Sequence, residues 1–162
     1  MKIHLIWAQD KNGGIGENGD LPWHISEDLK NFKSLTINST IIMGRKTWDS
    51  LLIKPLPKRN NIVLSSTKQD GVMTYNSIDK CLENLKKDQL EKIFIIGGRS
   101  IYNLFFNYAD YLHISFIHLI NKNINEFFPI KINEIQLKFK QISIEKLSDK
   151  ATYTFWEKIN TN

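Results

Sequence analysis

The segment I-M-G-R-K-T-W at residues 42–48 decides how this chain is expected to fold. Its start belongs to a short apolar run typical of a buried strand, and Gly44 leads directly into a helical pattern. A second segment, I-I-G-G-R-S-I-Y at residues 95–102, repeats the order of strand, glycine turn and helix. Two such units in one chain indicate an α/β fold built on parallel strands.

Strands and helices are expected to alternate through the first two thirds of the chain. Apolar runs of strand length, separated by turn residues, occur at 3–8, 40–43, 61–65, 93–96 and 111–118. Helical patterns lie between them at 26–35, 45–51, 78–87 and 100–107. After residue 129, two segments of rough alternation at 132–142 and 151–159 predict a closing antiparallel hairpin. The sequence therefore predicts a mostly parallel sheet with helices on both faces and a C-terminal hairpin.

Length and composition limit the classes of protein that fit. With 162 residues, 41% apolar and 24% charged, the chain is predicted to form a single domain over residues 1–162. Its one cysteine, Cys81, excludes an internal disulfide and a multi-thiolate zinc site, and its four histidines lack metal-ligand spacing, so no metal is expected. The sequence has neither an apolar run of roughly 18 residues nor the pattern of a cleavable signal, so we expect a cytoplasmic protein that binds no membrane.

The distribution of charge points to the kind of ligand. The formal charge is +5, but the 22 basic residues are interleaved with 17 acids, which favours anionic small molecules over nucleic acid. Only Arg45, Arg59 and Arg99 are arginines, so each is a candidate for a specific role. Arg59 ends a rigid basic stretch with two prolines, and its guanidinium suits a planar partner such as a carboxylate.

Asp28 is the acid with the most unusual predicted position. The helix at 26–35 is expected to begin with Ser26 as its cap, and Asp28 precedes Phe32 by four residues and Leu35 by seven. Its carboxylate should therefore lie near the apolar face, where burial raises its pKa and where a cationic or amidine-like ligand edge would be its partner. The alternative is that an acid in the first turn only stabilises the helix dipole.

Three turns have the chemistry of phosphate sites. Gly44 to Thr47 combines free backbone N–H groups with two cations at a helix start, and Gly97-Gly98 forms a second turn of this kind. Ser65 and Ser66 follow a third strand and add hydroxyls. Two such turns would suit a dinucleotide, although this is not the usual G-x-G-x-x-G pattern, and many strand-to-helix turns bind nothing.

The stretch at residues 10–23 holds four of the eight glycines between a strand and a helix. Such a segment is either a mobile loop that closes over a ligand or an ordinary long connection, and this stretch alone favours neither. It ends in Leu21-Pro22-Trp23, an apolar group that a merely solvated loop would not need.

Taken together and in this order, the segments resemble dihydrofolate reductase of the bacterial type over nearly the whole chain. The resemblance is carried by L-I-W-A-Q-D at 5–10, I-G-E-N-G-D-L-P-W at 15–23, I-I-M-G-R-K-T-W at 41–48, P-L-P-K-R-N at 55–60 and I-I-G-G-R-S-I-Y at 95–102. It implies a mostly parallel eight-stranded sheet with four flanking helices. It also implies a monomer that transfers a hydride from NADPH to 7,8-dihydrofolate, giving tetrahydrofolate, and that binds antifolate inhibitors.

The resemblance assigns roles residue by residue. Asp28 would bind the amino-pyrimidine edge of the pterin with Ser115 as its hydroxyl neighbour, Trp23 would order a water near the reacting ring, and water would enter past Leu21. The folate pocket would be lined by Ile6, Ala8, Leu29, Phe32, Leu51 and Leu56, with Arg59 on the α-carboxylate of the glutamate tail. The cofactor would contact Ala8, Ile15, Gly16, Gly44, Arg45, Lys46, Thr47, Ser65, Ser66, Ile96, Gly97, Gly98, Arg99, Ser100, Ile101 and Tyr102.

Two positions depart from the family pattern, and two rival functions stay open. Asn125 stands where the family often has an acid that contacts the 10–23 loop, so this loop is expected to be held differently. Arg99 adds a cation to the second glycine turn; it contacts phosphate or faces solvent, and solvent is favoured. A pyrimidine reductase of riboflavin synthesis and a nucleotide-binding or RNA-binding module are the rivals, but Asp28 and the 55–59 segment suit folate better.

Overall fold

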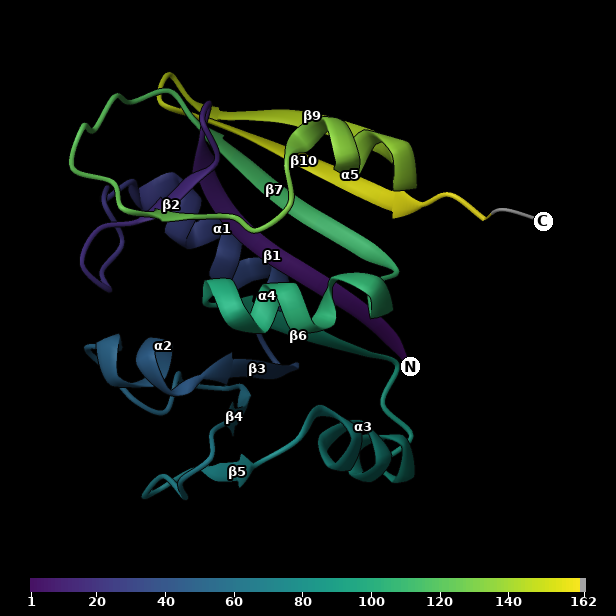
Figure 1. Cartoon of the computed structure of the whole chain (residues 1–162). Coiled ribbons are helices and arrows are strands. Elements are labelled where there is room, and N and C mark those ends of the chain that lie inside the picture. The colour runs from purple at the N-terminus through teal and green to yellow at the C-terminus, as the bar shows by residue number, and fades with distance from the viewer. Residues whose placement is uncertain (161–162) are drawn as a thin grey trace.

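The computed structural model describes residues 1–160 and is organised around one eight-stranded sheet with helices on both faces (Figure 1). In chain order the elements are β1 (Lys2–Asp10), β2 (Gly14–Gly16), α1 (Ser26–Thr36), β3 (Thr40–Gly44), α2 (Arg45–Ser50), β4 (Asn60–Leu64), β5 (Met73–Tyr75), α3 (Ile78–Lys87), β6 (Lys92–Gly97), α4 (Arg99–Phe105), the 3-10 helix η1 (Phe106–Tyr108), β7 (Tyr111–Ile117), β8 (Glu126–Phe127), α5 (Ile132–Lys138), β9 (Phe139–Ser148) and β10 (Ala151–Lys158).

The sheet confirms the predicted fold class. Its strands are ordered β5-β4-β3-β6-β1-β7-β10-β9, and every pair from β5 to β7 is parallel. The last two pairs, β7 with β10 and β10 with β9, are antiparallel, as the predicted C-terminal hairpin requires. A separate two-stranded ribbon joins β2 to β8.

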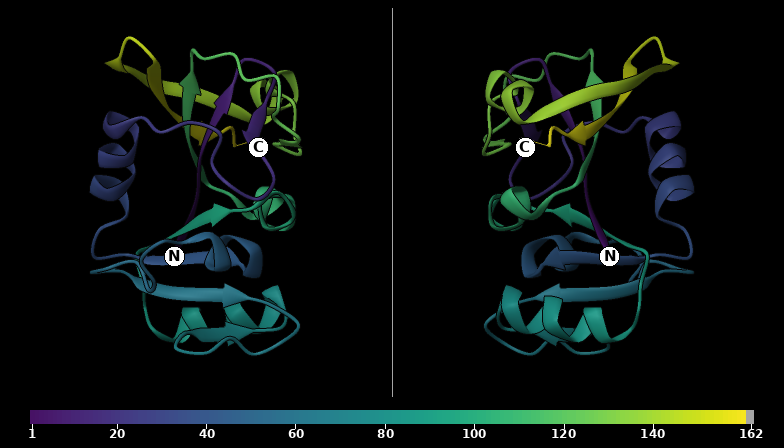
Figure 2. Two further views of the ribbon diagram at one scale, coloured as in Figure 1. Left: turned by 90° about the vertical axis from the view of Figure 1, so that its left-hand side faces the viewer. Right: turned by 90° about the vertical axis from the view of Figure 1, so that its right-hand side faces the viewer.

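Each face of the sheet packs against its own helices. Buried residues of α3, α4 and α5 share one cluster with Leu5, Trp7 and Ile42, while α1 and α2 pack against Ile6 and Met43 on the other face. Figure 2 shows α1 on one side of the sheet and α4 and α5 on the opposite side. Neighbouring residues of a strand alternate between the faces, so β1 serves both clusters.

The structure corrects several details of the sequence prediction. Residues 132–138 form α5, although their rough alternation predicts a strand, and β9 begins only at Phe139. A buried Ile135 on a short helix leaves the same sparse apolar signal as one face of a strand, so periodicity could not separate the two. Ser26 is the first helical residue and makes no capping bond, because Ile25 occupies the cap position. The short strands β2, β5 and β8 were not predicted.

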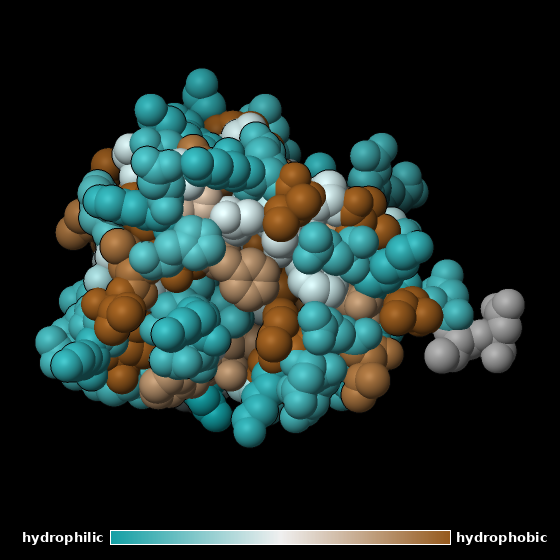
Figure 3. Space-filling view, turned by 90° about the horizontal axis from the view of Figure 1, so that it is seen from above, coloured by the Kyte–Doolittle hydropathy of each residue, from teal (hydrophilic) through white to brown (hydrophobic). Residues whose placement is uncertain are grey.

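Apolar side chains also reach the surface. Figure 3 shows, from above, a largely polar face on which apolar side chains lie in small groups. Exposed examples include Ile142 and Ile144 on the edge strand β9. Scattered apolar groups of this kind are ordinary on a protein surface.

A buried polar pair lies on the α1 face of the sheet. His4 of β1 and His113 of β7 are 9% and 5% exposed, and their Nδ1 and Nε2 atoms are hydrogen-bonded at 2.8 Å. Burial lowers the pKa of His4 to about 4 and that of His113 to about 3, and Lys92 adds to both effects. Both imidazoles are therefore neutral at neutral pH.

This pair should make folding stability depend on pH. An unfolded histidine takes up a proton near its ordinary pKa of 6.5, whereas the folded pair resists protonation to about pH 4. Stability contributed by the pair is therefore complete above pH 6.5 and is lost as pH falls toward 4. We expect His113→Phe to make the unfolding free energy less dependent on pH between 6 and 4, by up to about 1.4 kcal/mol per pH unit.

Urea unfolding at several pH values measures this slope. The exposed His118, changed to Gln, is the matched control and should leave the slope as it is. Equal slopes for His113→Phe and the unmodified protein would show that the buried pair does not titrate in this way.

Candidate active site

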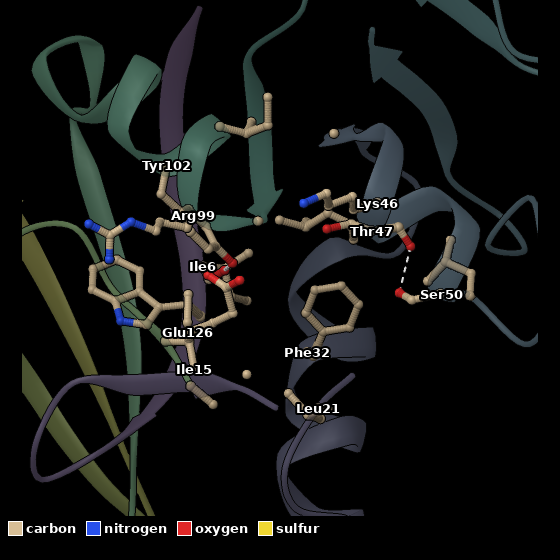
Figure 4. A pocket seen from close by; sticks show the side chains of 18 of the residues that line it. Ile6, Ile15, Leu21, Phe32, Lys46, Thr47, Ser50, Arg99, Tyr102 and Glu126 are labelled. Atoms are coloured by element: carbon tan, nitrogen blue, oxygen red, sulfur yellow. Dashed lines mark hydrogen bonds between the residues drawn. The ribbon is translucent and has the colours of Figure 1, made fainter. Parts of the chain in front are cut away.

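A cavity of about 860 Å³ opens outside the carboxyl ends of the parallel strands. Ala8 near the end of β1, Gly44 at the end of β3, Ile96 near the end of β6 and Ser115 of β7 all line it. Figure 4 shows Phe32 of α1 together with Lys46 and Thr47 of α2 on one side of this space, opposite side chains of α4 and β8. Open α/β sheets bind their ligands at this edge.

The cavity brings together nearly all the residues predicted for the site. Those that line it are Ile6, Ala8, Ile15, Gly16, Leu21, Asp28, Leu29, Phe32, Gly44, Arg45, Lys46, Thr47, Leu51, Leu56, Arg59, Ser65, Ser66, Ile96, Gly98, Arg99, Ser100, Ile101, Tyr102 and Ser115. Two predicted residues, Trp23 and Gly97, are not among the residues that line it. Helical spacing predicts that Leu29 points toward the core. In the structure its side chain is 38% exposed and lines the cavity.

Asp28 is a buried carboxyl in this wall. It is 9% exposed on the first turn of α1, because the helix begins only two residues earlier and turns this position toward the sheet. Burial raises the pKa of Asp28, and a hydrogen bond donated by the Ser115 hydroxyl opposes part of that rise. The carboxyl can therefore hold a proton at a higher pH than an exposed aspartate, and it can also accept hydrogen bonds from a ligand edge.

Two helix starts also line the cavity. Gly44 precedes α2 and Gly98 precedes α4, and neither helix has a side chain bonded at its N-cap. The first N–H groups of a helix have no partner within it, so they remain available to an anionic ligand. Arg45 and Lys46 add positive charge beside the first of these turns.

The glycines at these turns are required by close packing. A Cβ on Gly44 would lie 2.9 Å from Ile101 Cγ1, and a Cβ on Gly97 would lie 2.9 Å from the Tyr102 hydroxyl oxygen. Gly97 also has a φ of +114°, which side-chain-bearing residues rarely adopt. Tyr102 is fixed in turn, because its hydroxyl donates to the Ile6 carbonyl at 2.8 Å. The absence of a side chain at Gly97 thus allows Tyr102, a residue of the cavity wall, to keep this position.

Arg59 lies at a third part of the wall, beside α1. Its Nε donates to the Pro57 carbonyl at 3.0 Å and its Nη1 to Thr36 Oγ1 at 3.2 Å, while its guanidinium lies 5.9 Å from the centre of the Phe32 ring. These contacts fix the orientation of the guanidinium and leave other N–H groups for a ligand. Lys33, which was not predicted, lines the same cavity.

Trp23 is buried against Ile25 and Ala151 with Ala8 packed nearby. Among the residues described, its Nε1–H is the one buried side-chain polar group without a hydrogen-bond partner. A buried indole N–H ordinarily has a partner, so this atom indicates a place for a ligand or water.

The 10–23 loop is held by neutral amides. The Asn18 backbone N–H donates to Asn125 Oδ1 at 2.9 Å, and Asn125 Nδ2 donates to Asn18 Oδ1 at 2.8 Å. The β2–β8 ribbon lies next to this pair, and the Asn125 N–H donates to the Gly16 carbonyl at 3.1 Å. An asparagine at position 125 therefore contacts the loop without the charge of an acid.

Arg99 ties the same ribbon to α4. It is exposed, as favoured from the sequence, but its Nη1 donates to the Phe127 carbonyl at 2.9 Å. Figure 4 shows Arg99 and Glu126 on the same side of the cavity. Neither the phosphate nor the solvent alternative anticipated this contact, because β8 was not recognised as a strand.

Sequence reasoning also missed polar residues of the wall. His113, Tyr153 and Glu126 line the cavity although none was predicted for the site. His113 precedes Ser115 by two residues on β7, so strand alternation puts both on one face and could have indicated His113. Tyr153 lies on β10, and its place opposite Ser115 depends on the register of two strands, which could not be predicted. Within residues 1–160, no group of three or more histidine, cysteine, aspartate or glutamate side chains is arranged to hold a metal ion. Over the same residues, no helix is long and apolar enough to cross a membrane.

Fold and cavity together define an α/β enzyme that binds an anionic nucleotide cofactor beside a second ligand. A family model described as dihydrofolate reductase matches residues 2–159. The dihydrofolate reductase of Ureaplasma parvum serovar 3 is 44% identical over 117 residues, covering 70% of this chain and 73% of that protein. That of Buchnera aphidicola subsp. Acyrthosiphon pisum is 46% identical over 121 residues, covering 74% of each chain. The chain belongs to the dihydrofolate reductase family.

A solved structure agrees with this assignment. Dihydrofolate reductase from Enterococcus faecalis, complexed with NADP(H) and RAB-propyl, superposes with a TM-score of 0.84 at 29% identity, covering 98% of this chain and 97% of that one. Both the predicted family and the predicted fold are confirmed.

The amide pair at the loop gives a testable consequence. We expect Asn125→Ala to raise the hydrogen-exchange rate of residues 14–20 about fivefold, because a lost hydrogen bond costs about 1 kcal/mol. Both partners are uncharged, so the change should be the same at low and high salt. Hydrogen-exchange mass spectrometry measures it. Asn84→Ala, which removes an exposed amide on α3, is the control. Unchanged exchange in residues 14–20 would rule out the amide pair as the restraint.

Proposed function

We propose that this chain is an NADPH-dependent dihydrofolate reductase, which converts 7,8-dihydrofolate to tetrahydrofolate for one-carbon metabolism. The observation that carries the proposal is the buried Asp28 carboxyl in one cavity with two uncapped helix starts. One cavity thus combines a carboxyl that can bind an amino-pyrimidine edge with turns suited to phosphate. Family membership supports the same reaction.

Asp28 binds and polarises the pterin. Its carboxylate accepts hydrogen bonds from the N–H groups of the amino-pyrimidine edge, and the Ser115 hydroxyl holds the carboxylate in place. The apolar wall of Ile6, Leu29 and Phe32 packs on the ring and excludes water. The remaining substrate contacts fall on Ala8, Leu51 and Leu56, with Arg59 on the glutamate α-carboxylate.

The cofactor residues fit NADPH. Gly44 to Thr47, with Ser65 and Ser66, hold the adenosine phosphates, and the turn at Gly97 and Gly98 with Arg99, Ser100 and Ile101 holds the pyrophosphate. Ala8, Ile15, Gly16, Ile96 and Tyr102 surround the nicotinamide. NADPH supplies the hydride for the carbon–nitrogen double bond of the pterin.

The ring nitrogen of the pterin gains a proton, and Asp28, Leu21 and Trp23 act on the source of that proton. Since burial raises its pKa, Asp28 keeps a proton near the pterin to a higher pH than an exposed aspartate would. Leu21 is 51% exposed and lines the cavity, where it borders the entry of water. The Trp23 Nε1–H, buried without a partner, orients that water near the ring.

We propose that residues 1–162 form one domain, which acts as a cytoplasmic monomer and binds antifolate inhibitors in the substrate part of the cavity. The eight-stranded sheet joins strands from both ends of the chain, β1 to β10 without β2 and β8, which supports a single domain. The E. faecalis relative is described with RAB-propyl as well as NADP(H), which supports an inhibitor site.

The loss of NADPH absorbance on adding dihydrofolate tests the function, and Asp28→Asn tests the residue. We expect the variant to lower the hydride-transfer rate about 100-fold or more at neutral pH while NADPH affinity stays nearly unchanged, because the amide can neither hold the proton nor carry the charge. The unmodified enzyme should lose activity as pH rises through the raised pKa of Asp28, and the variant should lack this step. Glu27→Gln, which changes the neighbouring exposed acid, is the control.

The outcome can contradict either part separately. If the unmodified protein oxidises no NADPH with dihydrofolate, but does so with the pyrimidine substrate of riboflavin synthesis, the proposed function is wrong. Equal hydride-transfer rates for Asp28→Asn and the unmodified protein would remove only the role of Asp28.

Arg45 should set the preference for NADPH over NADH. Its Nη1 lies 3.0 Å from Asp49 Oδ2 in an exposed pair. This contact holds the guanidinium at the start of α2 and leaves its other N–H groups for a ligand. We expect Arg45→Ala to weaken the binding of NADPH about tenfold and the binding of NADH much less, because a charge-assisted hydrogen bond to the 2′-phosphate of NADPH is lost. Titration of cofactor fluorescence measures both affinities, with Lys87→Ala as a remote control. An unchanged ratio would place the 2′-phosphate elsewhere.

A further inference from the structure

Three side chains form a hydrogen-bonded chain that reaches the wall of the cavity. His4 Nδ1 lies 2.8 Å from His113 Nε2, and His113 Nδ1 lies 2.6 Å from the Tyr153 hydroxyl. The residues come from β1, β7 and β10, more than a hundred positions apart at the extremes, and both His113 and Tyr153 line the cavity. The described mechanism uses none of the three.

Tyr153 stands directly opposite Ser115 across the antiparallel pair of β7 and β10. Side chains of such a pair lie on the same face of the sheet, with their Cβ atoms about 5 Å apart. Ser115 donates a hydrogen bond to Asp28, and Tyr153, Ser115 and Asp28 all line the cavity. Tyr153 and Ser115 therefore lie side by side on the face of the sheet that lines the cavity, and Asp28 lines the same cavity.

The protonation states of His4, His113 and Tyr153 limit which hydrogen bonds these three residues can make. Burial holds the pKa of both imidazoles far below neutral pH and raises the pKa of Tyr153 to about 12, with Glu145 adding to the latter. Two other charged groups affect the pKa of His4, at the far end of the hydrogen-bonded chain: Lys92 lowers it and Asp110 raises it. A neutral imidazole has one donor and one acceptor nitrogen, so the two histidines must bond in a single consistent direction.

We propose that Tyr153 is a further substrate-binding residue, whose hydroxyl oxygen accepts a hydrogen bond from the N–H edge of the pterin, and that His113 and His4 are positioning residues that orient this hydroxyl. The inference rests on the proposed function. In this arrangement the Tyr153 hydroxyl donates to His113 Nδ1, and His113 Nε2–H donates to His4 Nδ1. The proton of the hydroxyl is thereby engaged and its lone pairs are left for a ligand that presents N–H donors.

A purely structural role makes a different prediction. The His113 ring stacks on Tyr153 and Phe155, with centroids 6.0 and 4.9 Å apart. Phenylalanine at position 113 or 153 would retain that packing while removing the hydrogen-bonding atoms. If the chain only fills space, these variants should bind substrate as well as the unmodified protein does.

The test is a double-mutant cycle on dihydrofolate binding. We expect Tyr153→Phe to raise the dihydrofolate Kd about threefold to tenfold, the effect of losing one partly buried hydrogen bond. His113→Phe should raise it by a similar factor, and the double variant should be no weaker than the weaker single variant, because His113 acts through Tyr153. Quenching of tryptophan fluorescence reports the Kd without turnover, and NADPH affinity should stay unchanged in all three variants.

Tyr111→Phe is the matched control. Tyr111 lies on the same face of β7 two residues before His113, but its hydroxyl donates to Glu157 Oε1 at 3.4 Å and it does not line the cavity. Its dihydrofolate Kd should equal that of the unmodified protein. A second measurement, nitrogen-15 NMR of the imidazoles, should find the Nε2–H tautomer of His113 when dihydrofolate is bound.

The outcomes separate this inference from the proposed function. A Tyr153→Phe Kd within twofold of the unmodified value, single effects that multiply in the double variant, or the Nδ1–H tautomer of His113 would each overturn it. Dihydrofolate binding with the expected cycle but no NADPH oxidation would leave the inference standing and overturn the reductase function. Failure of the unmodified protein to bind dihydrofolate would overturn both.

Discussion

The structure depends on the parallel pairing of β1 with β6 on one side and with β7 on the other. This pairing brings Ala8 level with Ser115, and it places the glycine turn after β6 beside the end of β1. Because all three strands run the same way, their carboxyl ends meet at one edge, where helix starts and ligand-facing side chains collect. The cavity is a consequence of strand direction, and its chemistry follows from which residues happen to end those strands.

Local signals explain how much of this could be predicted from the sequence. The buried strands and the two glycine turns are continuous in the chain, so apolar runs and turn chemistry suffice to find them. Asp28 could be recognised because helical spacing alone puts it on the apolar face. In contrast, α5 has too few apolar residues to separate helix from strand, and β2 and β8 are only three and two residues long.

Contacts between distant segments could not be predicted in the same way. The four histidines show no metal-ligand spacing in the sequence, yet His4 and His113 are hydrogen-bonded across 109 positions because β1 and β7 are neighbours. Position 125 was recognised as a departure from the family, but its asparagine partner at position 18 depends on the β2–β8 pairing. Such pairs depend on register, and a one-residue shift in register would place every side chain on the opposite face.

The placement of charge in the cavity now gives the composition a physical meaning. All three arginines line the cavity, although lysines outnumber arginines nineteen to three in this sequence. Arg45 and Arg59 lie where phosphate and carboxylate are proposed to bind, while Arg99 uses its planar donor array on a backbone carbonyl of β8. The cavity side chains proposed to act with Asp28 are the opposite case, because Ser115, Tyr153 and His113 are uncharged at neutral pH. A cation there would lower the pKa that burial raises, so uncharged neighbours preserve a carboxyl that holds a proton to a higher pH than an exposed aspartate does.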